Sequence, residues 1–177
     1  GRSLNLSAEA NFQRLDASGL TEYITGSNTG AVITKVKCKT LVIPENAQYK
    51  DIKEVAFPTD FILSYNMQTL SPILAILDRT NASLRIPHIA KENEALNINQ
   101  QANKELLEDF LDNYKHSYHF LTNRNVEDAV QDFTESRHID LMVMVAKNLN
   151  YFQQILFHTK VEKISYHTDI PFLVLHE

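Results

Sequence analysis

The sequence predicts an α/β fold built on a parallel sheet with helices on both faces. From Lys53 onward, strand-like and helix-like segments alternate without interruption. One of these segments, 141–146, is apolar throughout, as expected for a strand that is buried on both faces. The chain has 177 residues, of which 44% are hydrophobic, so it is long enough to bury one substantial core.

Each element of this alternation has its own signal. A short apolar strand that runs into a Pro-Thr-Asp turn is expected at 53–61, and further strands are expected at 83–90, 116–123, 141–146 and 171–176. Helices are expected at 66–79, 92–113, 125–138 and 149–166, where apolar residues recur at helical spacing. Pro72 is expected near the first turn of its helix or at a kink. Right-handed crossovers then favour a doubly wound, five-stranded Rossmann-like or flavodoxin-like sheet with strand order 3-2-1-4-5.

Composition excludes several classes of function. The formal net charge of −5 argues against a nucleic-acid partner, which requires clustered lysine and arginine. No apolar run reaches the roughly 20 residues of a membrane span, and no signal peptide is evident, so a cytoplasmic protein without a membrane partner is expected. Cys38 is the only cysteine and is expected to be a buried, unreactive thiol.

Glycine usage is unusually low. The four glycines all lie in the first 30 residues, so 31–177 contains none. A glycine-rich phosphate-binding loop is therefore excluded from that stretch.

A segment near the N-terminus resembles the end of the chain. Shifting the sequence by 132 positions places 24–45 over 156–177 without a gap, with a helical pattern followed by an apolar strand in both. This repeat suggests a tandem duplication. We therefore expect 1–46 to be the C-terminal remnant of a first domain, contributing a helix and a last strand, and 47–177 to be a complete second domain.

These features resemble the universal stress protein family. The segment VAFPTDF is similar to the family's first strand, which ends near an aspartate, and IDLMVMV is similar to its fourth strand. The resemblance implies a last strand, here 40–44, that pairs antiparallel with 172–176, either within a chain or between two chains, and adds an extra edge strand to the sheet. A homodimer, formed through last strands or exposed helix faces, is also expected, because a remnant domain would leave apolar helix surface exposed, and so is an unknown protein partner.

The resemblance also implies a nucleotide site. Carried over position by position, that site comprises a first-strand aspartate, a second-strand residue near the adenine, a residue before the loop, three loop glycines and a loop hydroxyl. The corresponding residues are Asp60, Ile89, Met144, Val145, Asn148, His158 and Thr159. None of the three glycines is present, and Val145 in particular is poorly suited to a positive φ. We therefore expect a degenerate site with no cofactor, although ATP or AMP remains the alternative.

No catalytic group or metal site is assigned. His116 and His119 lie three apart in an expected strand and should point to opposite faces, which does not suit a shared metal ion. The expected function is that of a non-enzymatic stress-response or regulatory module that works through dimerisation and partner binding. The alternatives are an ATP- or AMP-binding protein with little or no hydrolysis and, by fold analogy only, an enzyme of the wider adenine-nucleotide α-hydrolase-like superfamily.

Overall fold

The structure is a computed structural model that describes residues 10–15, 21–25, 38–44, 47–48, 50–90, 95–122, 126–146 and 170–176; only the backbone is described for 10–15, 21–25, 126 and 127. The chain forms two compact units. One unit is Lys50–Val143, and the other combines Gly1–Tyr49 with Met144–Glu177. The boundary between the units falls inside a single strand, β7.

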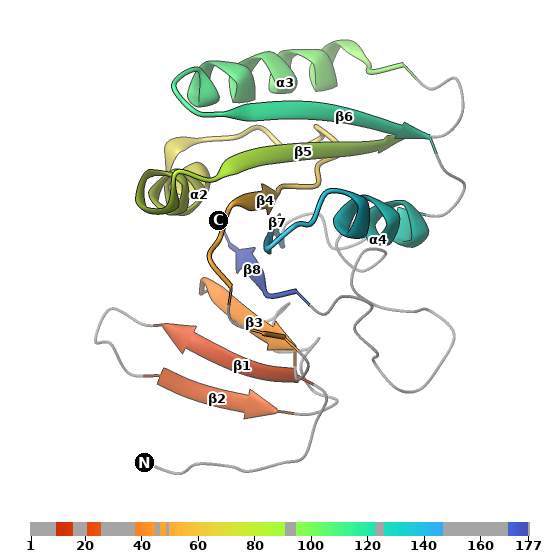
Figure 1. Cartoon of the computed structure of the whole chain (residues 1–177). Coiled ribbons are helices and arrows are strands. Elements are labelled where there is room, and N and C mark those ends of the chain that lie inside the picture. Colours follow the sequence, from red (N-terminus) through yellow and green to blue (C-terminus); the bar gives the residue numbers. More distant parts are fainter. Residues whose placement is uncertain are drawn as a thin grey trace. The chain divides into compact units, whose positions relative to one another are not determined.

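The Lys50–Val143 unit contains the predicted alternation of strands and helices (Figure 1). In chain order its elements are β4 (Glu54–Ala56), α2 (Met67–Thr80), β5 (Ser83–Ala90), α3 (Ile98–Leu111), β6 (His116–Thr122), α4 (Val126–Ser136) and the start of β7 (Leu141–Val145). Strand β4 pairs parallel with both β5 and β7, and β5 pairs parallel with β6. The resulting order β6-β5-β4-β7 confirms the first four strands of the predicted arrangement.

Asparagine side chains set the starts of the two helices for which caps are described. The side chain of Asn66 accepts from the amide of Thr69 and starts α2, which ends at Asn81 in the left-handed conformation. Asn97 and Gln100 form a capping box at the start of α3. This cap explains why α3 begins at Ile98, whereas the amphipathic pattern predicted a start near residue 92.

Pro72 lies inside α2, past its first turn. A proline has no amide hydrogen, so it cannot donate to the carbonyl of Gln68 one turn earlier. The hydroxyl of Ser71 donates to that carbonyl instead, at 3.3 Å. A neighbouring side chain therefore satisfies the acceptor that the proline leaves open.

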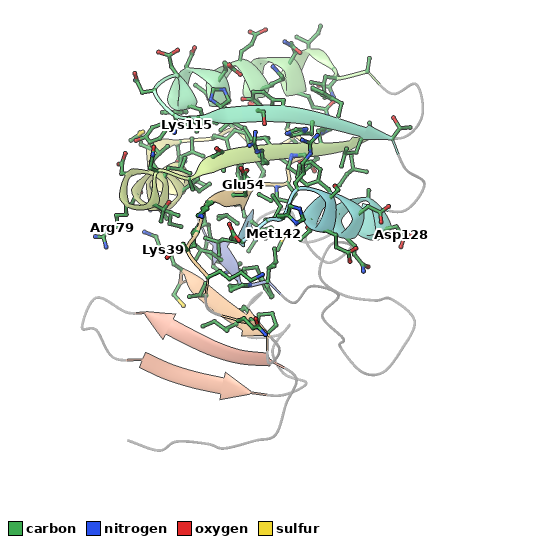
Figure 2. The ribbon with its side chains drawn as sticks, in the orientation of Figure 1. Lys39, Glu54, Arg79, Lys115, Asp128 and Met142 are labelled. Atoms are coloured by element: carbon green, nitrogen blue, oxygen red, sulfur yellow. The ribbon has the colours of Figure 1, made fainter. Side chains whose placement is uncertain are left out.

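Helices α3 and α4 pack on opposite faces of β6. Glu108 of α3 contacts His116 at 3.1 Å, whereas Phe133 of α4 lies against the ring of His119, with 5.0 Å between ring centroids. Since His116 and His119 are an odd number of residues apart in a strand, they point to opposite faces, as predicted. Figure 2 shows Met142 among the core side chains and Arg79 and Lys115 at the surface.

The second unit is built on antiparallel pairing. Strand β3 (Thr40–Pro44) pairs antiparallel with β8 (Phe172–Leu175), with Thr40 opposite Val174 and Val42 opposite Phe172, which confirms the predicted pairing. Val42 and Phe172 are fully buried. Cys38, just before β3, is half-buried rather than buried as expected.

The N-terminal residues also contain a hairpin that the sequence did not predict. Strands β1 (Ala10–Leu15) and β2 (Thr21–Thr25) pair antiparallel, and β1 pairs with the other edge of β3. Strand β3 therefore lies between β1 and β8. The predicted helix was placed from Ile24, but Ile24 and Thr25 end β2; the rest of that helix, and the helix predicted at 149–166, lie outside the described residues.

Candidate functional site

Asp60 lies in the loop that follows β4, at the carboxyl edge of the parallel strands. Before it, the chain continues β-like pairing, since the amide of Phe57 donates to Arg85 and that of Thr59 to Pro87. The Asp60 carboxylate is half-exposed and accepts from the amide of Ile62 at 3.0 Å. This short-range turn fixes the carboxylate at the surface of the loop.

Side chains of α3 hold this loop in place. Gln100 donates to the carbonyl of Asp60 at 2.8 Å, and Asn103 donates to that of Phe61 at 2.8 Å. Phe61 has a φ of 57°, which is unfavourable for a residue with a bulky side chain. The two amide side chains therefore stabilise a strained loop conformation that Phe61 would not adopt by itself.

Phe61 packs into an aromatic cluster next to the loop. Its fully buried ring lies 5.0 Å from that of His88 and 6.1 Å from that of Tyr118, measured between centroids. Nδ1 of His88 donates to the carbonyl of Thr59 at 2.9 Å, and the Lys104 ammonium lies 4.3 Å from the centre of the Tyr118 ring. Burial is the main cause of the raised pKa of the Tyr118 hydroxyl.

Ile89, the residue expected near an adenine ring, follows His88 in β5. Its side chain is 8% exposed, so it is almost wholly enclosed by other side chains. The structure thus places Asp60 and Ile89 in the same unit, with Asp60 accessible and Ile89 buried.

Met144 and Val145 belong to the other unit, at the end of β7. Both side chains are buried. Val145, which the resemblance assigns to the first loop glycine, is an ordinary strand residue and is not among the described residues with positive φ. The amide of the next residue, Ala146, donates to the carbonyl of Leu175 at 2.8 Å, so β-pairing uses it.

The remaining predicted site residues, Asn148, His158 and Thr159, lie outside the described residues. No group of three or more potential metal ligands occurs among the residues that the structure covers. Within the same ranges, no helix is long and apolar enough to cross a membrane.

Sequence reasoning missed the second polar group of this unit, which lies on the α4 face of β6. Arg85 pairs with Glu54 and donates to the hydroxyl of Ser117, which in turn contacts His119. The segment HSYHF of β6 could have revealed this group, because residues two apart in a strand, such as Ser117 and His119, point to the same face. The contacts of Gln100 and Asn103 with the Asp60 loop were also missed. The one sequence signal near them is the capping pattern that begins at Asn97, at the start of α3.

Comparison with solved structures decides the fold. A universal stress protein from Archaeoglobus fulgidus superimposes with a TM-score of 0.58 over 84% of this chain, at 11% sequence identity. The chain has the universal stress protein fold. A second universal stress protein, solved in complex with cAMP, matches with a TM-score of 0.51 and 14% identity, covering 72% of this chain and 98% of its own.

Other universal stress protein structures match less of their own length. A putative universal stress protein from Pseudomonas aeruginosa has a TM-score of 0.52 at 12% identity, over 86% of this chain and 57% of its own. The present chain likewise spans about half, 53%, of the Archaeoglobus structure. No protein-family model and no curated protein matches the sequence, so the universal stress protein fold is recognised here from structure rather than from sequence identity.

Proposed function

We propose that this chain is a universal stress protein-like regulatory module that works as a homodimer and through partner binding, without a bound nucleotide. The observation that carries the proposal is the use of the Ala146 amide in the sheet. A phosphate-binding loop needs free backbone amides and close approach by the ligand. Here the Ala146 amide donates to the carbonyl of Leu175, and the neighbouring Val145, which the resemblance assigns to a loop glycine, has a buried side chain.

The surface around the Asp60 loop supports a role in partner binding. Three large apolar side chains are exposed there: Ile62 at 65%, Ile98 at 89% and Phe120 at 56%. All three belong to elements that contact this loop: Ile98 is the first residue of α3, whose Asn103 donates to the carbonyl of Ile62 at 3.3 Å, and the ring centroid of Phe120 lies 6.5 Å from that of Phe61. Exposed apolar side chains gathered at one edge are typical of a protein interface.

This surface, rather than the last strand, is the proposed dimer contact. Strand β8 already pairs with β3 of the same chain, which leaves that edge of β8 without open backbone groups. We expect light scattering after size-exclusion chromatography to give a dimer that Ile98→Glu converts to a monomer. The control Ile76→Glu alters a half-buried side chain on α2. A monomeric parent chain, or an unchanged dimer in Ile98→Glu, contradicts this contact.

Binding of adenine nucleotides is the second candidate, because one matching structure was solved with cAMP and Asp60 is accessible at the corresponding strand end. Calorimetry with ATP, AMP and cAMP at millimolar concentration separates the two. The main proposal expects no saturable heat. Saturable binding that Asp60→Ala abolishes, and that the exposed control Asp128→Ala retains, establishes the nucleotide-binding function instead.

A further inference from the structure

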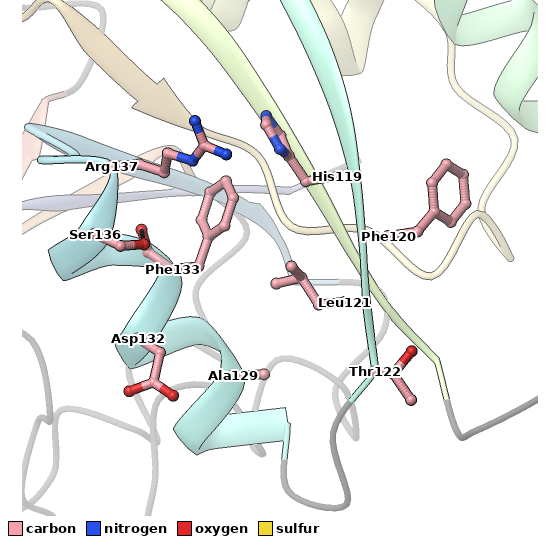
Figure 3. Close-up of a pocket in the computed structure, with 9 residues that line it drawn as sticks. All are labelled: His119, Phe120, Leu121, Thr122, Ala129, Asp132, Phe133, Ser136 and Arg137. Atoms are coloured by element: carbon pink, nitrogen blue, oxygen red, sulfur yellow. Dashed lines mark hydrogen bonds between the residues drawn. The ribbon is translucent and has the colours of Figure 1, made fainter.

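A pocket of about 430 Å³ lies between β6 and α4. Figure 3 shows His119, Phe133 and Arg137 turned toward one another along one side of it, with Leu121 and Ala129 further along. All the lining residues belong to the Lys50–Val143 unit. A volume of this size suits a small organic molecule.

The hydrogen-bond chain behind the pocket fixes the donor that His119 presents. Arg85 donates to the Ser117 hydroxyl at 2.9 Å, and this hydroxyl lies 2.8 Å from Nε2 of His119. The arrangement satisfies each group when Ser117 accepts from Arg85 and donates to Nε2. The neutral ring then carries its hydrogen on Nδ1, which has no hydrogen-bond partner within the described part of the chain.

Arg137 supplies the charge. Its guanidinium has no ion pair or hydrogen bond to any described residue, and it lies close enough to His119 to help lower the pKa of that imidazole, although burial is the larger cause. The positive charge of Arg85, in contrast, is paired with Glu54 in two contacts of 2.6 and 3.0 Å. Arg137 is therefore the cation of this group that is available to a ligand.

The rest of the lining is mixed: Phe120, Leu121, Ala129 and Phe133 are apolar, whereas Thr122, Asp132 and Ser136 are polar. Phe133 is 5% exposed and presents its ring beside His119, while Ala129 and Leu121 continue the wall. Asp132 adds a negative charge to the rim, which disfavours polyphosphates and other multiply charged anions.

We propose that this pocket binds a small organic anion with a flat apolar body, such as an aromatic monocarboxylate. The carboxylate accepts from Arg137 and from Nδ1 of His119, and the ring packs against Phe133. This site is separate from the Asp60 loop and does not depend on whether the chain binds a nucleotide.

The experiment is an NMR titration of the full chain with benzoate, with benzamide as the uncharged probe of the same shape and inorganic phosphate as the anion without a ring. We expect saturable shifts of amide resonances in β6 and α4 with benzoate. We expect binding about tenfold weaker with benzamide, because the charged hydrogen bonds are lost. Absence of saturation with benzoate, or equal affinity for benzamide or phosphate, overturns the proposal.

Substitutions of lining residues test whether benzoate binds in this pocket. Arg137→Gln should weaken benzoate binding about tenfold, to the level of benzamide. Ser136→Trp should block the pocket, whereas Ser71→Trp should not. The two serines are matched, because both are exposed and both donate to a carbonyl three residues earlier, at 3.2 and 3.3 Å. Benzoate binding that survives both Arg137→Gln and Ser136→Trp contradicts the assignment. Asp60→Ala should leave benzoate binding unchanged, which separates this result from the nucleotide experiment.

Discussion

The side-chain amide of Asn103 donates to the backbone carbonyl of Phe61 at 2.8 Å, across 42 positions of sequence. This contact joins the middle of α3 to the one residue of the Asp60 loop with a positive φ. The conformation of the loop therefore depends on a helix that the chain reaches much later.

Removal of this contact should destabilise the fold. Asn103→Ala is expected to lower the free energy of unfolding by about 1–2 kcal/mol, since it leaves a partly buried carbonyl without its donor. Gln101→Ala on the same helix is the control, because Gln101 is exposed and its side chain donates to Glu105 one turn on. Urea denaturation measures the free energy of unfolding of both variants. An equal effect of the two substitutions contradicts the role given to Asn103.

A second prediction concerns Asn81, the residue in the left-handed conformation that ends α2. Asn81 has a φ of 52° and closes the helix through its amide to Leu77. Asn81→Val is expected to cost about 1–2 kcal/mol, because a β-branched residue is unfavourable in this conformation. Asn81→Gly should change stability by less, since glycine adopts positive φ readily. Thermal unfolding of the two variants is the measurement. An unchanged stability of Asn81→Val contradicts the assigned cap.

The Glu54–Arg85 pair should contribute modestly to stability. The pair is bidentate, and each side chain is 27% exposed, so solvent screens it in part. Glu54→Gln is expected to cost about 1 kcal/mol. A double-mutant cycle with Arg85→Met measures the coupling directly. A coupling energy of zero shows that the pair adds nothing beyond its two separate side chains.

His119 should make stability depend on pH. Burial, with Arg137 and Arg85, lowers its pKa in the folded chain below the ordinary value near 6.5. Below that value the unfolded chain binds the proton more readily than the folded chain, so the stability falls as the pH decreases from about 6.5 toward the folded pKa. His119→Gln should reduce this slope.

The His119 pKa can be measured directly by following its ring resonances with pH. A folded-state value at or above 6.5 contradicts the predicted direction. His176, whose pKa burial also lowers, adds to the same pH dependence, so His119→Gln reduces the slope without removing it.

The sequence alone determined the order and type of most described elements. Strand β5 was predicted at 83–90, where it lies, and β6, α4 and β8 differ from their predicted ranges by at most two residues at either end. The parallel order and the antiparallel pairing of β3 with β8 were also predicted. The elements and their parallel order follow from local periodicity and from the right-handed crossover, whereas the antiparallel pairing of β3 with β8 was implied by the resemblance to the universal stress protein family.

Tertiary structure alone decided the details of the sites. The β1–β2 hairpin, the support of the Asp60 loop by Gln100 and Asn103, and the chain from Arg85 through Ser117 to His119 were not predicted. Most of these contacts join residues about 30 to 42 positions apart. Each depends on how neighbouring strands and helices align, and a single sequence contains no local signal for that alignment. The use of the Ala146 amide by Leu175 is of the same kind, and it is the contact on which the proposed function rests.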